Sequence, residues 1–129
     1  MTSTSEFGYL PQYAGNSVKT GLIVQKASVS QATSITTGVT ANGSSGIITT
    51  QAASTAADGE ETFTLTNSAI KAESIVFAHI VSYSGTFATN GTPTVAVDAI
   101  ADGSCNIVIM NGAAVNALSG TFEIAFVVL

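Results

Sequence analysis

The side chains that could do acid–base, nucleophilic or metal chemistry are few and widely separated in this sequence. The chain has 129 residues, with one His and one Cys. His79 lies within an apolar run at residues 75–81, and Cys105 opens a second apolar run at residues 105–110. A zinc site needs several His, Cys or carboxylate ligands, and a nucleophilic thiol needs a neighbouring base. We therefore expect Cys105 to be a buried structural thiol and His79 to be a histidine of the core or of an interface.

The acidic residues offer two candidate pairs. Glu60 and Glu61 stand beside a turn at the start of a predicted strand, which is typical of a solvated acidic loop and not of a general acid–base pair. Asp98 and Asp102 are four residues apart, a spacing that matches no calcium-binding loop. The Gly/Ser loop at residues 43–46 lacks the Gly-x-Ser-x-Gly order of a hydrolase nucleophile. The sequence therefore predicts no catalytic residue, no metal site and no cofactor, and we do not expect an enzyme.

Charge is scarce and mostly negative. The net charge is −5, the chain has three Lys and no Arg, and charged residues make up 9% of it. Nucleic acids and anionic membrane surfaces are bound by clusters of Lys and Arg, so neither is an expected partner. No run of 18 apolar residues is present, and residues 1–6 show no signal-peptide pattern. A surface this poor in charge either faces other protein chains or takes its polarity from Ser, Thr, Asn and Gly, and both remain open.

From residue 27 onward, short β-type runs alternate with turn dipeptides such as Asn42-Gly43, Asp58-Gly59 and Asn90-Gly91. Such dipeptides supply the positive φ of tight turns, and the spacing of the runs favours a sandwich or a barrel. One turn around residues 67–71 is the only helical candidate. The sequence predicts an all-β protein, namely an antiparallel, jelly-roll-like β-sandwich at residues 27–129. Alternation within the runs predicts these inward-facing side chains: Phe63, Leu65, Val95, Val97, Phe122, Ile124, Phe126 and Val128.

Residues 1–26 differ from the rest, and we interpret them as an extended N-terminal arm preceding the sandwich domain at residues 27–129. Aromatic side chains are uncommon in disordered leaders, yet this segment is rich in them. We expect it to bind a partner chain, and folding back onto its own domain is the alternative. The partner-binding residues of the arm are predicted to be Phe7, Tyr9, Leu10 and Tyr13.

Two predicted strands, at residues 75–81 and 105–110, are apolar on both faces. In a sandwich only one face of each sheet meets the core, so a second apolar face must be covered by something else. Large exposed apolar patches are rare on monomers. The pattern therefore indicates a homo-oligomer, with a predicted subunit interface formed by Val76, Ala78, Ile80, Val108 and Met110.

An ordered series of short segments resembles small structural proteins of tailed bacteriophages, including phages of marine bacteria and cyanobacteria. The resemblance covers roughly residues 28–129 and not the arm. The segments that carry it are Val29-Ser30-Gln31-Ala32-Thr33-Ser34, residues 37–40, Gly46-Ile47-Ile48-Thr49, Thr62-Phe63-Thr64-Leu65-Thr66-Asn67-Ser68 with Ile70, Gly103-Ser104-Cys105, Asn111 and Leu118.

The resemblance implies a trimeric β-sandwich virion protein without catalytic residues. One expected role is a decoration or cement protein on the outer surface of the capsid, bound through its arm to the major capsid protein or another virion protein. The alternative is a head- or tail-fibre knob that binds a host-surface ligand, with loops around residues 84–92 and 111–120 as its binding face. A carbohydrate-binding domain ranks third, because the chain has no Trp and only three Tyr.

Overall fold

Strand formation follows the alternation of apolar and polar side chains along the chain. Phe63 and Leu65 are buried, whereas the neighbouring Thr64 and Thr66 are exposed. The last strand alternates in the same way, and its four inward side chains, from Phe122 to Val128, are all buried, as predicted. The β-branched and aromatic residues of these runs suit a pleated, half-buried surface.

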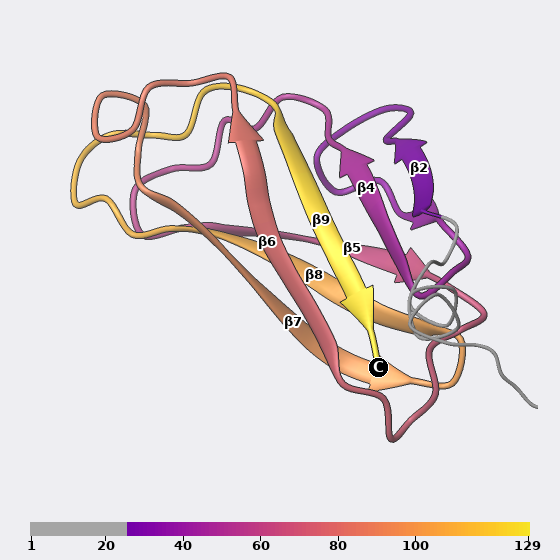
Figure 1. Ribbon diagram of the computed structural model, residues 1–129. Helices are drawn as coiled ribbons and strands as arrows, with labels where there is room; N and C mark the ends of the chain where they lie inside the picture. The colour runs from indigo at the N-terminus through magenta and orange to yellow at the C-terminus, as the bar shows by residue number, and fades with distance from the viewer. Residues whose placement is uncertain (1–25) are drawn as a thin grey trace, which may run out of the picture.

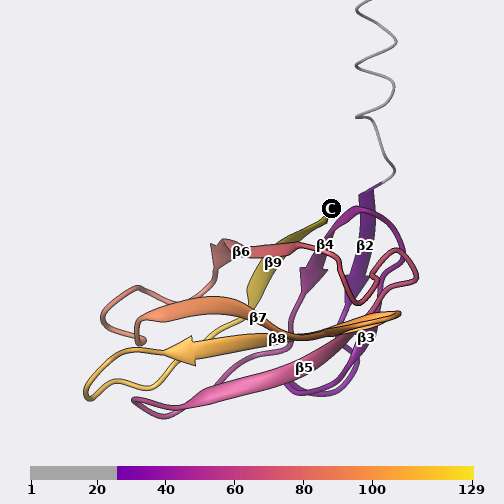
Figure 2. The same cartoon turned by 90° about the horizontal axis from the view of Figure 1, so that it is seen from below.

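The computed structural model describes residues 26–129, which form two four-stranded sheets and contain no helix. The sheets are stacked as two layers (Figures 1 and 2). One sheet, called here the β6 sheet, has the order β2-β4-β9-β6, and the other, the β8 sheet, has the order β3-β5-β8-β7. The strands are β2 (Lys26–Ser30), β3 (Val39–Thr40), β4 (Ser45–Thr49), β5 (Glu60–Thr66), β6 (Val76–Tyr83), β7 (Pro93–Ala101), β8 (Ser104–Asn111) and β9 (Phe122–Val128).

Both sheets are mixed, so the expectation of an antiparallel sandwich is wrong for two strand pairs. The pairs β2–β4 and β3–β5 are parallel, and the other four are antiparallel. The parallel pairs also depart from the wholly antiparallel pairing of a jelly roll. Each involves an edge strand that is only two or five residues long, too short to leave a signal in the hydrophobic pattern. The all-β, two-layer prediction is confirmed.

The core lies between the two layers. From the β6 sheet it receives Phe122, Ile124 and Phe126, and from the β8 sheet it receives Phe63 and Ile107, all of them at most 2% exposed. Val95 and Val97 are partly buried and pack against this core, which confirms their predicted direction. Burial at about 25 cal/mol per Å² of apolar surface makes these side chains the main source of stability.

Asn67 organises the single turn that the sequence singled out at residues 67–71. Its side-chain oxygen accepts hydrogen bonds from the backbone N–H groups of Ala69 (2.9 Å) and Gly43 (3.0 Å), and its amide donates to the Gly43 carbonyl (2.7 Å). The backbone N–H of Ile70 bonds to the Asn67 carbonyl. The segment is a capped turn, and the fully buried Asn67 is satisfied without water.

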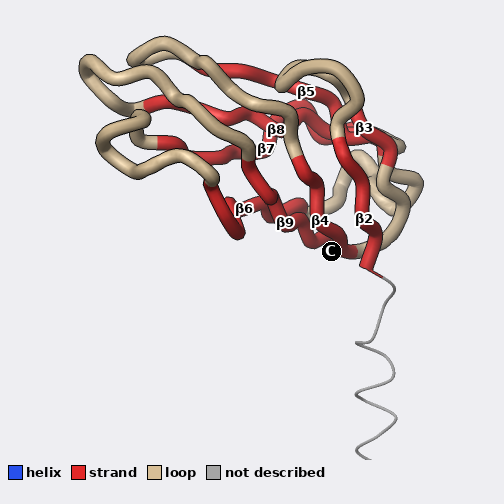
Figure 3. The backbone as a smooth tube through the Cα atoms, turned by 90° about the horizontal axis from the view of Figure 1, so that it is seen from above, coloured by secondary structure: helices blue, strands red, loops and turns tan. Residues whose placement is uncertain are grey.

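Most of the predicted arm lies outside the described residues. The described chain begins at Lys26, which the sequence reading assigned to the arm and which is the first residue of β2. The structure therefore places the entry point of residues 1–25 at the edge strand of the β6 sheet. The longest loops gather at the opposite end of the molecule from β2 (Figure 3).

Candidate functional site

The two residues best suited to nucleophilic chemistry point away from each other. His79 is on the outer face of the β6 sheet and exposed, whereas Cys105 is on the inner face of the β8 sheet and buried. Burial raises the pKa of the Cys105 thiol, which keeps it protonated and unreactive. The prediction of a buried structural thiol is confirmed. The interpretation of His79 as a core residue is wrong, and its place in an interface stays a prediction.

The acidic residues do not converge on a site. Glu60 is exposed, and Glu61 accepts a hydrogen bond from the hydroxyl of Thr55 at 3.2 Å. The Asp98 carboxylate accepts a hydrogen bond from the backbone N–H of Ala99 (2.7 Å). The Asp102 carboxylate accepts one from the backbone N–H of Ala72 (2.8 Å). Within residues 26–129 no group of three or more His, Cys, Asp or Glu side chains is placed to hold a metal ion.

Asn111 shows how the buried polar groups are used. Its side-chain oxygen accepts hydrogen bonds from the N–H groups of Thr92 (3.0 Å) and Ala113 (3.1 Å). Its amide donates to three backbone carbonyls, those of Thr55, Ala56 and Asn116, at 3.2, 3.1 and 2.9 Å. Such a saturated side chain holds loops together and has no bond left for a ligand.

The feature that requires a functional explanation is apolar and lies on the outer face of the β6 sheet. Five large apolar side chains there are 41–71% exposed, which amounts to on the order of 500 Å², toward the upper end for the largest patch on a monomer. We call this surface the outer apolar face, and its residues are Ile75, Phe77, Val81, Val127 and Leu129.

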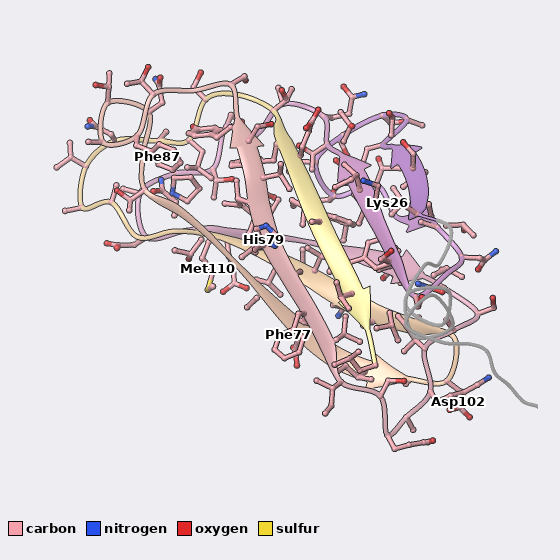
Figure 4. The ribbon with its side chains drawn as sticks, viewed as in Figure 1. Lys26, Phe77, His79, Phe87, Asp102 and Met110 are labelled. Atoms are coloured by element: carbon pink, nitrogen blue, oxygen red, sulfur yellow. The ribbon has the colours of Figure 1, made fainter. Side chains whose placement is uncertain are left out.

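Strand pairing makes the outer apolar face continuous. Phe77 of β6 lies opposite Val127 of β9 in the antiparallel ladder. Ile75 and Leu129, just beyond the strands, are joined by two backbone hydrogen bonds of 3.1 and 2.8 Å. His79 lies two residues from Phe77 on the same face, and Figure 4 shows both side chains projecting from β6.

The predicted interface residues on β6 point the other way. Val76 is buried in the core, and Ala78 and Ile80 are partly buried against it. The physical reason is the pairing with β9, which sets Ala78 and Ile80 opposite the buried Phe126 and Ile124. The prediction that β6 has a second apolar face describes the chain correctly, but the side assigned to the interface is the side that faces the core.

On β8 the predicted side agrees with the structure. Cys105, Ile107 and Ile109 face the core, whereas Val108 and Met110 lie on the outer surface of the β8 sheet, where both are half-buried. Their neighbours across the ladder include Thr62 and Glu60 of β5, so this surface is more polar than the outer apolar face. An interface through Val108 and Met110 stays a prediction.

The edge strands are poorly suited to pair with another chain. β2 and β3 are short, β6 has a bulge between Ile80 and Ser82, and β7 begins with Pro93. β7 also has an irregular register after Asp98, with Ala99 at a φ of 53°. Short length, bulges and proline are the devices that block edge-to-edge pairing. A partner is therefore expected to meet this molecule through side chains on a face.

The long loops at the far end form a second exposed surface. The Tyr83 hydroxyl donates to the carbonyl of Asn90 (2.6 Å) and accepts from the N–H of Ser119 (3.0 Å), so it joins the two loops that the sequence reading grouped. Phe87, 60% exposed, packs edge-on against the Tyr83 ring with centroids 5.5 Å apart, and Val115 is 84% exposed. Figure 4 shows Phe87 at this end, distant from Lys26.

Sequence reasoning missed two exposed residues that lie just outside β6 and β9. Ile75 and Leu129 flank β6 and β9, and their exposure depends on where each strand ends. A sequence signal did exist for Val127. It is four residues from Glu123, so the two side chains share a face of the strand, and the charge of Glu123 marks that face as the outer one.

Residues 26–129 include no helix long and apolar enough to cross a membrane. The sequence matches no protein-family model and no curated protein, and the fold matches no solved structure.

Proposed function

We propose that this chain is a non-enzymatic structural protein of a virion, which decorates the outer surface of a capsid and stabilises it. The observation that carries the proposal is the outer apolar face, because an exposed apolar patch toward the upper end of the monomer range often marks an interaction surface. The resemblance of residues 28–129 to tailed-phage structural proteins supplies the virion context.

Two surfaces are assigned roles in this proposal. The N-terminal arm, through Phe7, Tyr9, Leu10 and Tyr13, binds the major capsid protein or another shell protein. Copies associate with one another on the shell, most simply as trimers, through the outer apolar face. Many weak contacts repeated over a shell give strong total binding, so neither surface needs high affinity alone.

The architecture supports a role in assembly and not in catalysis. The buried polar side chains of the described region, such as Asn111 and Asn67, spend their hydrogen bonds on the backbone. The edge strands are blocked, so assembly through a face avoids the uncontrolled strand pairing that would aggregate a β-protein.

Capsid binding tests the proposal directly. Purified full-length chain is mixed with undecorated heads of the virus that encodes it, and bound copies are counted after sedimentation. We expect saturable binding, and we expect it to be lost in a full-length variant with all four arm residues changed to Ser. A Phe87→Ser variant serves as the control, because that side chain is as exposed as Phe77 but lies in the far loops. Undiminished binding by the arm variant would contradict the assigned role of the arm.

The loop end favours a second candidate, a fibre knob that binds a host-surface ligand. Phe87 and Val115 are exposed on loops fixed by Tyr83 and by the hydrogen bond from the Asn116 amide to the Ala88 carbonyl (2.8 Å). A rigid scaffold presenting exposed loop side chains is a common arrangement for ligand binding. Saturable binding to host cells, abolished by Phe87→Ser and unaffected by the arm variant, would favour this role over decoration.

A further inference from the structure

The outer apolar face has a defined size and shape. It extends along β6 from Ile75 to Val81, which is about 20 Å at the usual rise per residue of a strand. Across the sheet it includes Val127 and Leu129 of the neighbouring β9. His79 lies between Phe77 and Val81 on this face and is polar, and the small Ala125 lies opposite it on β9. An occupant therefore has to be apolar, uncharged and about seven extended residues long.

The chain itself contains such a segment. Residues 7–13 have no charged side chain, and Phe7, Tyr9, Pro11 and Tyr13 recur at every second position. In an extended conformation, period-two spacing places these four side chains on one side, and seven residues span about 20 Å. The length and the apolar side of this segment therefore match the outer apolar face.

The attachment point brings the segment within reach of its own face. Lys26 lies opposite Ser45, Ser45 lies opposite Val127, and Val127 lies opposite Phe77. Lys26 and Phe77 are therefore three strand spacings apart, about 14 Å. Residues 14–25 lie between the segment and Lys26, and treating these 12 residues as a random coil gives a root-mean-square span of about 20 Å. The effective concentration of a tethered group is highest when the span of its linker matches the distance to its site.

A neighbouring molecule is a weaker competitor for the same face. Tethering at a matched distance gives effective concentrations in the millimolar range, whereas the purified protein in solution is a thousandfold more dilute at micromolar concentrations. The bulge in β6 also disfavours an occupant that pairs its backbone with the edge of that strand.

We propose that in the free chain residues 7–13 lie across the outer apolar face of their own molecule. The contact keeps the face away from water and from other copies. This proposal goes beyond the decoration role and does not depend on it, because the contact forms in the free chain, before any capsid is bound. If decoration also holds, transfer of the arm to the shell uncovers the face for neighbouring copies.

A single-tryptophan variant tests this proposal, because the sequence contains no Trp. Phe77→Trp places the reporter on the outer apolar face in the full-length chain, where the native side chain is 60% exposed. We expect blue-shifted emission and weak acrylamide quenching. Adding Ser at Phe7, Tyr9, Leu10 and Tyr13 should shift the emission to the red and raise the quenching constant to that of an exposed Trp. The protection seen with the native arm should be independent of protein concentration.

Two controls make the result specific. Phe87→Trp reports on an equally exposed side chain in the far loops, and the arm substitutions should leave its emission unchanged. Inserting 24 Gly/Ser residues between residues 14 and 25 triples the linker and should lower the effective concentration about fivefold, with partial loss of protection at Phe77→Trp. Circular dichroism checks that each variant folds.

Three results would overturn the proposal. The first is equal quenching of Phe77→Trp with and without the arm substitutions. The second is protection that appears only as protein concentration rises, which would assign the face to a second copy. The third is an equal change at Phe87→Trp, which would show a global effect. Capsid binding is measured separately, so its failure leaves this test intact.

Discussion

At the scale of single residues, stability depends on buried amides that hold separate loops together. Asn111 is 2% exposed and joins segments near residues 55, 92 and 116 through five side-chain hydrogen bonds. The sequence did not reveal this role, because an Asn before Gly is also the ordinary signature of a turn. Only the fold shows that loops far apart in sequence supply its partners.

Substituting Asn111 with Ala should therefore be costly. The change leaves several buried backbone groups without partners, and we expect the free energy of unfolding to fall by about 3 kcal/mol. Urea denaturation followed by circular dichroism measures the loss. Asn106→Ala on the same strand is the matched control, since that side chain only accepts a bond from the Thr64 hydroxyl at 3.2 Å. It should change stability by less than about 0.5 kcal/mol, and equal losses would contradict the role of Asn111.

The Cys105 thiol makes stability fall at alkaline pH. Burial raises its pKa in the folded state, so the unfolded chain loses the thiol proton at a lower pH than the folded chain does. Its contribution is complete below the ordinary thiol pKa of about 8.5 and is lost as the pH rises from there toward the raised pKa. Unfolding free energies between pH 7 and 10 should therefore decline less steeply in Cys105→Ala. Parallel declines in the two proteins would show that the thiol does not contribute.

At the scale of strands, close packing between β4 and β9 depends on the absence of a side chain. A Cβ on Gly46 would lie 2.5 Å from Cε2 of Phe126 and 2.8 Å from the carbonyl oxygen of Ala27. Gly46 is opposite Phe126 in the ladder, so the aromatic ring occupies the space above the glycine. Nothing in the sequence indicated that Gly46 packs against an aromatic ring.

A double-mutant cycle tests this packing. Gly46→Ala alone should destabilise the protein by about 2 kcal/mol, and the same change should cost less in a Phe126→Leu background, where the ring is absent. Gly103→Ala is the control: its Cβ meets nothing within 4 Å, so only its φ of +87° opposes the substitution. Its cost should not depend on Phe126→Leu. Additive effects of Gly46→Ala and Phe126→Leu in chemical denaturation would refute the close approach.

Strand directions were predictable where a polar residue marked the outer face. On β8, Asn106 shows which positions face out, and Val108 and Met110 follow from it. On β6 the residues from Ile75 to Val81 are apolar except His79, and an imidazole suits either side of a strand. The alternation was therefore visible, but the side that faces the core was decided by pairing with β9, a contact between distant parts of the sequence.

At the scale of the whole molecule, the sequence predicted two layers of strands but not their order. The parallel pairing of β2 with β4 and of β3 with β5 depends on short edge strands, whose position is set by the sheets they join and not by their own residues. For the same reason, the candidate site could be predicted only in part from the sequence. A surplus apolar face was predictable from strand runs that are apolar on both faces, but its location required the assembled sheets.

Self-association follows from the outer apolar face once it is uncovered. We expect the full-length chain to sediment as a monomer at micromolar concentrations, and the four-Ser arm variant to associate, because an apolar area on the order of 500 Å² then meets water. Adding Phe77→Asp to that variant should restore the monomer. Adding Phe87→Asp, at an equally exposed position in the far loops, should not. Sedimentation velocity over a concentration series distinguishes these outcomes.

The position of β9 has a consequence for how the protein is made. It is the last strand in the chain, yet within the β6 sheet it is the strand with which both β4 and β6 pair. During translation β9 emerges from the ribosome after β4 and β6, so those two strands must wait for this shared partner. The β8 sheet, complete at residue 111, can assemble first, and the β6 sheet forms only after β9 has been made, a non-local step of the kind that makes β-proteins fold slowly.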